Sequence, residues 1–131
     1  MATSRVTVHF PCPVEQVWQT ATELTHTAWR SDLDRVEVLD ETHFVEHTKS
    51  GYATAFTVTA CEPIRRWAFT MENGNMSGAW EGIFQAAEDG TRLTCTETIV
   101  GKHWWMRPFV PSYLKRQQRL YLNDLRKELL K

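Results

Sequence analysis

The strongest constraint on the fold is a hydrophobic period of two that runs through most of the chain. Apolar and polar side chains alternate in six segments, which span residues 35–40, 42–49, 52–62, 65–72, 76–87 and 91–100. Short groups of turn residues separate these segments, and Asp89-Gly90 is the strongest local hairpin signal among them. Such alternation is typical of half-buried strands, so the sequence predicts an antiparallel meander with one apolar face.

A further strand and a short helix are predicted before the meander. Residues 4–10 alternate, and Pro11 and Pro13 then end the strand. Pro13 suits the first turn of a helix, where its missing N–H needs no partner. Residues 14–23 carry apolar side chains on one helical face, and residues 24–31 are expected to form an irregular or helical connection.

The end of the chain predicts a long helix that covers the apolar face of the sheet. No glycine or proline occurs between Pro111 and Lys131, and Ser112 is the expected N-cap residue. About twenty residues at ~1.5 Å each reach roughly 30 Å, which is enough to cross the sheet. Asp124 and Glu128 are expected to balance the basic residues on a solvated outer face of this helix. The inner, apolar stripe consists of Leu114, Gln117 or Gln118, Tyr121, Leu122, Leu125 and Leu129.

Length and composition predict one α+β domain over residues 1–131. The chain has 131 residues, no internal repeat and no linker-like segment, so a division into two domains is not expected. Its 42% of hydrophobic residues can form a core without disulfides or metal ions. Six tryptophans are more than a minimal core needs, and the lining of a pocket is one use for them.

Four segments resemble one family in the order in which they occur. These are Phe10-Pro-Cys-Pro-Val-Glu-Gln-Val-Trp18, Cys61-Glu-Pro-Ile-Arg-Arg-Trp67, Gly90-Thr-Arg-Leu-Thr94, and the group Leu122, Leu125, Glu128 and Leu129. The whole chain thus resembles the START-like (SRPBCC, helix-grip) superfamily, and within it the polyketide cyclase/dehydrase group. The resemblance implies a curved antiparallel sheet of about seven strands wrapped around the C-terminal helix, with one or two short helices after the first strand. It also implies a ligand cavity between sheet and helix.

Alternation and the helical stripe together nominate the residues that would line this cavity. Glu97 is the most informative, because alternation puts its carboxyl group on the apolar face between Cys95 and Ile99. A carboxylate there needs a partner or a wet cavity, so Glu97 is either a polar anchor or general base in a pocket, or a side chain turned outward or paired with an arginine. The expected ligand-binding residues are Tyr52, Thr54, Phe56, Trp67, Phe69, Met71, Trp80, Phe84, Cys95, Glu97, Gln117 and Tyr121.

Several functions find no support in the sequence. His43 and His47 lie four residues apart in a predicted strand, about 13 Å, which is too far for one metal ion. No phosphate-binding glycine loop or nucleophile motif is present, so neither a cofactor nor a catalytic residue is assigned. The net charge of −1 gives no field for nucleic acid, and no segment is apolar enough to cross a membrane. The first ten residues do not resemble a signal peptide, and three widely spaced cysteines favour a reducing cytoplasm.

Three functions remain open at this stage. The first is a non-catalytic carrier or sensor of an apolar or aromatic small molecule such as a lipid or polyketide. The second is a polyketide cyclase/dehydrase-type enzyme, and the third is a protein-interaction module of the co-chaperone type with a filled interior. Trp104, Trp105, Met106 and Phe109 either plug the start of the long helix, gate the pocket or touch a membrane, and plugging is favoured over membrane contact. The chain is expected to be a monomer or homodimer.

Overall fold

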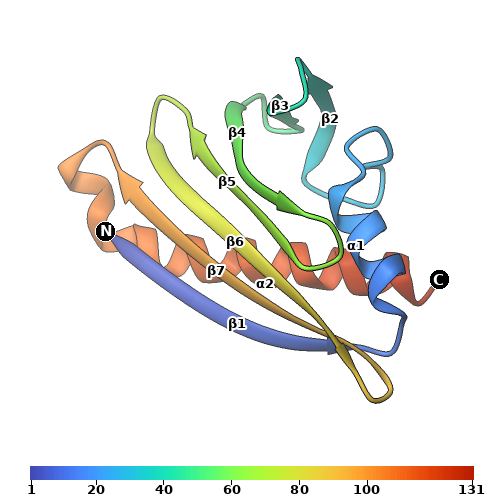
Figure 1. The fold of residues 1–131 in the computed structure, drawn as a ribbon. Helices are drawn as coiled ribbons and strands as arrows, with labels where there is room; N and C mark the ends of the chain where they lie inside the picture. Colours follow the sequence, from blue (N-terminus) through green and yellow to red (C-terminus); the bar gives the residue numbers. More distant parts are fainter.

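Seven antiparallel strands form one curved sheet, and a long helix lies across its concave face (Figure 1). The computed structural model describes residues 1–131. In chain order the elements are β1 (Ala2–Phe10), α1 (Val14–Thr22), β2 (Leu33–Val38), β3 (His43–Thr48), β4 (Ala53–Glu62), β5 (Arg66–Glu72), β6 (Met76–Ala87), β7 (Gly90–Gly101), the 3-10 helix η1 (Trp104–Phe109) and α2 (Val110–Leu129). This is the predicted α+β helix-grip fold, with one short α-helix after the first strand.

The sheet has the strand order β1-β7-β6-β5-β4-β3-β2. The meander runs from β2 to β7 through tight turns, and β1 returns to pair with β7 from Ala2↔Ile99 to Phe10↔Thr91. β1 and β2 are therefore the two edges. The prediction started β2 at Arg35, whereas the strand begins at Leu33, because an irregularity between Leu33 and Arg35 interrupts the alternation there.

The first turn of α2 differs from the prediction. Ser112 was expected to cap the helix, but α2 begins at Val110 and no side chain caps it. The reason is the preceding 3-10 helix, which runs directly into α2 through Phe109. Pro111 lies in the first turn, where it has no N–H to satisfy.

Two of the family-like segments meet at the end of the sheet where β1 leads into α1. Gly90 opens β7 with φ +154°, and a Cβ there would collide with the carbonyl oxygen of Phe10. The buried hydroxyl of Thr91 donates a hydrogen bond of 2.7 Å to the carbonyl oxygen of Cys12. The glycine and threonine thus tie the β6–β7 hairpin to the proline-rich corner.

The helix α1 fills one end of the concave face. Its Trp18 packs edge-on against Phe84 at 5.0 Å and against Trp67 at 6.4 Å between ring centroids. Val17 is fully buried beside them in the same hydrophobic cluster. This end of the interior is a packed core, and any open space must lie further along the sheet, towards the start of α2.

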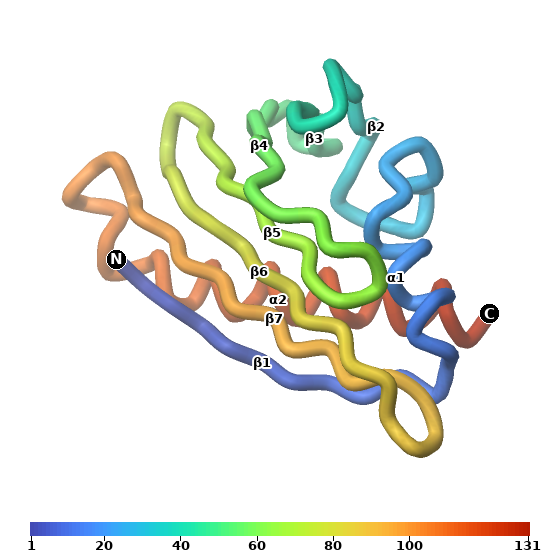
Figure 2. Tube along the Cα trace, in the orientation of Figure 1, coloured from blue at the N-terminus to red at the C-terminus, as the bar shows by residue number.

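The connection between α1 and β2 is anchored to the second half of α2 (Figure 2). Asp124 accepts hydrogen bonds of 2.8 Å from both the backbone N–H and the hydroxyl of Ser31. The expectation that Asp124 lies on the solvated face is wrong, because its side chain is buried in these contacts. The connection is thereby held over the interior, although its sequence has no regular period.

Candidate functional site

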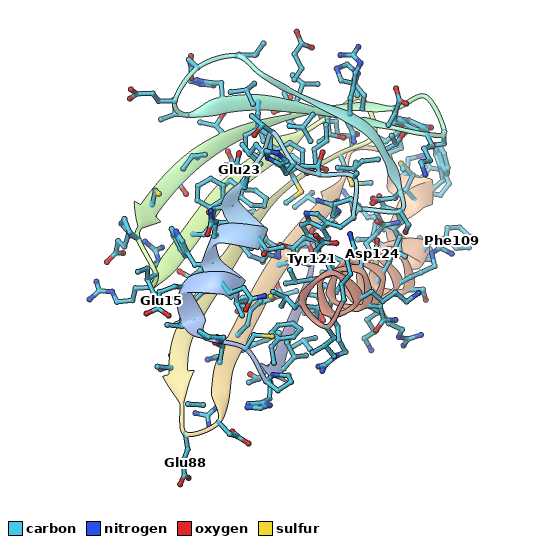
Figure 3. All side chains as sticks on the ribbon, turned by 90° about the vertical axis from the view of Figure 1, so that its right-hand side faces the viewer. Glu15, Glu23, Glu88, Phe109, Tyr121 and Asp124 are labelled. Atoms are coloured by element: carbon cyan, nitrogen blue, oxygen red, sulfur yellow. The ribbon has the colours of Figure 1, made fainter.

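A cavity of about 140 Å³ lies between the concave face of the sheet and α2. Strands β3 to β7, the connection after α1, and α2 all contribute to its wall. Figure 3 looks along α2 from the end where α1 lies, and its label places Tyr121 on the side of α2 that faces the sheet. The nineteen lining residues are Arg30, Asp32, Glu46, Thr48, Thr54, Phe56, Phe69, Met71, Asn73, Met76, Trp80, Cys95, Glu97, Ile99, Tyr113, Gln117, Gln118, Tyr121 and Leu122.

Stacked and edge-on aromatic rings form the middle of the wall. Phe69 of β5 stacks on Trp80 of β6 with ring centroids 5.0 Å apart, and Phe56 of β4 meets Phe69 edge-on at 5.2 Å. Tyr121 closes the row from α2, at 6.1 Å from Trp80. A Cβ at Gly82 would collide with the indole of Trp80, so the missing side chain at this position leaves room for the ring. The wall therefore presents flat apolar surfaces to the cavity.

A buried ion-pair group forms the end of the cavity under β2 and β3. The guanidinium of Arg30 lies 3.4 Å from both an Asp32 oxygen and a Glu46 oxygen, and 5.0 Å from the ring centroid of Tyr121. Burial raises the pKa of Glu46, and Arg30 opposes this rise. Burial lowers the pKa of Arg30, but the two carboxylates outweigh it and the net change is upward. Arg30 is thus a permanent cation shared between two acids.

Glu97 lies in the centre of the wall with no hydrogen-bond partner. It belongs to β7, where it pairs across the sheet with Ser4 of β1 and Trp80 of β6. Alternation correctly predicted that it faces the interior. Burial, and then repulsion from Glu46, raises its pKa to about 7, while Arg30 opposes the shift. This carboxyl group can therefore hold or release a proton near neutral pH.

Gln118 lines the same cavity as Glu97, from the helix side. Its side-chain NH₂ donates a hydrogen bond of 3.1 Å to the backbone carbonyl of Ser4, the residue directly across the sheet from Glu97. Only 4% of Gln118 is exposed, and its Oε1 has no partner. A buried amide oxygen without a donor is costly, so this atom is a candidate contact for a ligand.

An outer groove of about 710 Å³ continues from the cavity to η1. Seven residues line both spaces, among them Thr54, Asn73 and Gln117. Tyr52 lies at the rim of the groove, where its hydroxyl accepts a 3.2 Å hydrogen bond from the amide of Asn75. Trp105 and Phe109 form the far side of the groove, so the cavity opens towards the 3-10 helix.

The aromatic residues of η1 do not plug the helix start, contrary to the favoured expectation. Trp104 is 78% exposed, Trp105 56% and Phe109 69%. Only Met106 of this group is partly buried, against Gly101. The reason is that η1 bends away from the sheet after β7, so the indole rings extend outward.

The twelve expected ligand-binding residues fall into three groups. Tyr52 lines the outer groove alone, and Trp67 and Phe84 line neither space because α1 covers them with Trp18. The other nine surround the cavity, and they are Thr54, Phe56, Phe69, Met71, Trp80, Cys95, Glu97, Gln117 and Tyr121. Whether any of them contacts a ligand stays a prediction.

Three charged residues of the wall, Arg30, Asp32 and Glu46, escaped the sequence analysis, whereas Glu97 was expected there. Glu46 carried a usable signal, because it lies two residues from Phe44 in an alternating strand and so shares its inward face. Arg30 and Asp32 carried none, since they belong to an aperiodic connection that reaches the cavity through tertiary contacts. Gln118 was considered as an alternative to Gln117, and both line the cavity.

No group of histidine, cysteine and acidic residues in the structure is suited to hold a metal ion. His43 pairs with Asp40 at 2.9 Å, and His47 pairs with Glu37 of the neighbouring strand at 3.1 Å. All three cysteines are free, and burial, followed by the nearby Glu97, raises the pKa of Cys95 to about 12. Cys95 is therefore a neutral wall residue. None of the helices is both long and apolar enough to traverse a bilayer.

Comparison with solved structures finds proteins of similar fold. A START superfamily protein from Mycobacterium smegmatis superposes with a TM-score of 0.87 at 9% identity, covering 97% of this chain and 96% of its own. DynU16, from the dynemicin biosynthetic locus, gives 0.79 at 19% identity, and the di-domain aromatase/cyclase BexL, from the BE-7585A pathway, gives 0.79 at 18%. Both matches cover 98% of this chain, but only 47% of DynU16 and 50% of BexL.

A search of curated protein sequences found no match. The profile of one family, described as "Polyketide cyclase / dehydrase and lipid transport", matches residues 1–130. This match agrees with the helix-grip topology and with the cavity beneath the sheet. The chain therefore belongs to the polyketide cyclase/dehydrase and lipid transport family of START-like domains.

Proposed function

We propose that the protein is a carrier or sensor that holds one apolar, ring-containing small molecule between the sheet and α2. The observation that carries the proposal is the row formed by Phe56, Phe69, Trp80 and Tyr121, which faces open space while the neighbouring end of the interior is packed. Apolar walls with a few convergent polar groups are typical of small-molecule sites. The family match supports the same class of ligand.

The dimensions favour a ligand of two parts. An apolar cavity of about 150 Å³ is enough to hold a benzene ring. The inner cavity, at about 140 Å³, is therefore suited to a single ring or a short branched group. The outer groove, at about 710 Å³, has room for a longer remainder that reaches Trp105 and Phe109.

An enzyme of the cyclase/dehydrase type is the second candidate, and one observation favours it. Glu97 faces the cavity with a pKa raised to about 7, which suits a general acid or base at neutral pH. Tyr121 is the second group of this kind, and burial raises its pKa, so its hydroxyl stays protonated. Turnover of a polyketide substrate that Glu97→Gln abolishes, without loss of binding, would support catalysis over carriage.

The interaction-module hypothesis has less support. It requires a filled interior, and the open space under the sheet is better suited to a ligand.

The three free cysteines, two of them buried, favour a reducing compartment such as the cytoplasm.

Filling the cavity tests the binding proposal. N-phenyl-1-naphthylamine is an uncharged dye at neutral pH whose fluorescence rises in apolar surroundings. We expect saturable binding to the wild type and at least a tenfold loss of affinity in Met71→Trp, because Met71 lines the cavity. Thr70→Trp adds the same ring to the opposite, exposed face of β5 and should bind like the wild type. Equal dye binding by both variants would refute the site.

A further inference from the structure

The cavity wall has an excess of negative charge. Three carboxyl groups line it, those of Asp32, Glu46 and Glu97, whereas Arg30 is the single basic side chain among the lining residues. In an interior of low dielectric constant such an imbalance is unfavourable unless protons or a cation compensate it.

Arg30 compensates two of the three acids. Its guanidinium lies 3.4 Å from oxygens of both Asp32 and Glu46, and its outer face lies against Tyr121. No ion pair or hydrogen bond joins Arg30 to Glu97, whose carboxyl group has no partner of either kind. Glu97 is therefore the part of the wall that lacks a positive counterpart.

Unpartnered neutral and charged oxygens are found in the same wall. Gln118 is 96% buried, its NH₂ group is engaged with the carbonyl of Ser4, and its Oε1 accepts no hydrogen bond. The other two buried atoms without a hydrogen-bond partner, Arg30 Nε and Asp32 Oδ1, lie 3.4 Å apart and form an ion pair with each other. Gln118 and Glu97 line the same cavity, and Gln118 is bonded to Ser4, the strand neighbour of Glu97. Apart from the Arg30–Asp32 ion pair, the buried polar atom of the wall that lacks a partner is therefore an acceptor, the amide oxygen of Gln118.

The aromatic rings add a third feature of the same kind. Trp80 is the sheet neighbour of Glu97 on the other side, and Tyr121 faces Trp80 from the helix. The faces of such rings attract cations when water is excluded. An ammonium group near Glu97 would have a carboxylate, an amide oxygen and two aromatic rings around it.

We infer that the ligand of this cavity carries a protonated amine on an apolar skeleton, and that Glu97 and the Oε1 of Gln118 bind the ammonium group. The inference rests on the proposed ligand-binding function and narrows its ligand class from apolar molecules in general to apolar amines.

Protonation of Glu97 gives the binding a defined pH dependence. Burial and Glu46 raise its pKa to about 7 while Arg30 opposes the rise, so the empty cavity holds a proton on Glu97 below neutral pH. An entering ammonium group must displace this proton, and amine affinity should therefore rise with pH up to about 7 and then level off. Of the other groups that face Glu97, Tyr113, Tyr121 and Cys95 have pKa values raised further above neutral pH, and Arg30 stays charged. Glu46 is the second carboxyl group that faces it, and burial raises its pKa as well, so its protonation contributes in the same direction.

Three ligands of one skeleton separate charge from apolar contact. We choose 4-phenylbutylamine, 4-phenylbutan-1-ol and 4-phenylbutyrate and measure their binding by isothermal titration calorimetry at pH 7.5. Charge-assisted hydrogen bonds contribute about 1.5–3 kcal/mol, which predicts that the amine binds the wild type about tenfold or more tightly than the alcohol. The carboxylate is expected to bind more weakly than the alcohol.

Matched variants test whether Glu97 and Gln118 cause the preference for the amine over the alcohol. Glu97→Gln keeps the size of the side chain and should bring the amine to the affinity of the alcohol, while the alcohol itself binds as before. Gln118→Leu should lower amine affinity in the same direction. Glu88→Gln changes an exposed carboxylate at the β6–β7 turn, labelled in Figure 3, and should keep the full preference.

The outcomes distinguish the two proposals. Alcohol binding without a preference for the amine, or an amine preference that survives Glu97→Gln, would overturn the ammonium site and leave an apolar cavity in place. No binding by any of the three ligands would contradict the cavity itself. Proton release on amine binding at pH 6, measured from the heats in two buffers, should disappear in Glu97→Gln.

Discussion

At the scale of single residues, the carboxyl groups of Asp124 and Glu97 have opposite surroundings. Asp124 is buried where two donors of Ser31 reach it at 2.8 Å. Glu97 is partly buried at the cavity wall, where no protein donor reaches it, and its pKa rises to about 7. Hydrogen bonds stabilise the charge of the first, whereas burial disfavours the charge of the second.

Replacing Glu97 should change how stability depends on pH. The native pKa of about 7 lies above the ordinary value of 4.5, so the native state binds the extra proton between these values and the wild type loses stability as pH rises through this window. At 1.36 kcal/mol per pKa unit, the loss is at most about 3 kcal/mol. Glu97→Gln removes this titration and should be more stable than the wild type at pH 8.

Urea unfolding of both proteins at pH 4.5 and pH 8 measures this difference. The exposed Glu88→Gln serves as the control and should follow the wild type at both values. A wild type that keeps its stability from pH 4.5 to pH 8 would contradict a buried, unpartnered Glu97.

Replacing Asp124 should lower stability, in contrast to the gain expected for Glu97→Gln at pH 8. Asp124→Ala removes the buried carboxylate that accepts two hydrogen bonds from Ser31, which should lower the free energy of unfolding by about 1–3 kcal/mol. Glu128→Gln on the same helix is the control, since the ion pair of Glu128 is with the exposed Lys131. Equal stability of the two variants in urea unfolding would mean that Asp124 does not hold the connection.

At the scale of elements, β6 shapes the cavity through one missing side chain. The indole of Trp80 occupies the space above Gly82, where a Cβ would collide with it. The ring is thereby held flat against Phe69, at 5.0 Å between centroids. The wall of the cavity depends on this glycine as much as on the tryptophan.

Gly82→Ala should displace the indole into the cavity. We expect a destabilisation of about 1–3 kcal/mol, as for other overpacked sites, together with weaker dye binding. Gly74→Ala is a matched control, because a Cβ at the β5–β6 turn meets nothing within 4 Å. The two variants are compared by urea unfolding and dye titration, and unchanged dye affinity in Gly82→Ala would separate Trp80 from the site.

The 3-10 helix offers a second matched pair. Trp105 lines the outer groove, whereas its neighbour Trp104 lies outside both spaces and is 78% exposed. Trp105→Ala should weaken binding of a ligand long enough to leave the inner cavity, by about tenfold or less, while Trp104→Ala should bind normally. Equal losses in both variants, measured with 4-phenylbutan-1-ol, would remove the groove from the ligand path.

Element-level patterns carried most of the fold and part of the site. Alternation predicted all seven strands and the inward face of Glu97, because a half-buried strand leaves a clear period of two. The N-cap preference of serine was misleading at the start of α2, where a 3-10 helix runs into the helix in place of the expected cap at Ser112. Alternation could not find Arg30 or Asp32, since only tertiary contacts bring that connection over the cavity.

At the scale of the whole molecule, one end of the domain interior is a packed core and the rest encloses a cavity. The sheet bends around both helices, α1 closes one end with Trp18, and α2 covers the rest (Figures 1 and 3). The six tryptophans predicted either a filled interior or a lined one. The structure divides them: Trp18 and Trp67 fill the core, Trp80 lines the cavity and Trp105 lines the groove. Of the other two, Trp29 packs against Tyr121 and Trp104 is exposed.

The central claim is that one small molecule occupies this space. Native mass spectrometry of the protein purified from its own host tests it most directly. The account predicts a species heavier than the polypeptide by one small apolar molecule, which is released on denaturation and is absent from Met71→Trp. A wild type that carries only the mass of its polypeptide, identical in occupancy to Met71→Trp, would contradict it.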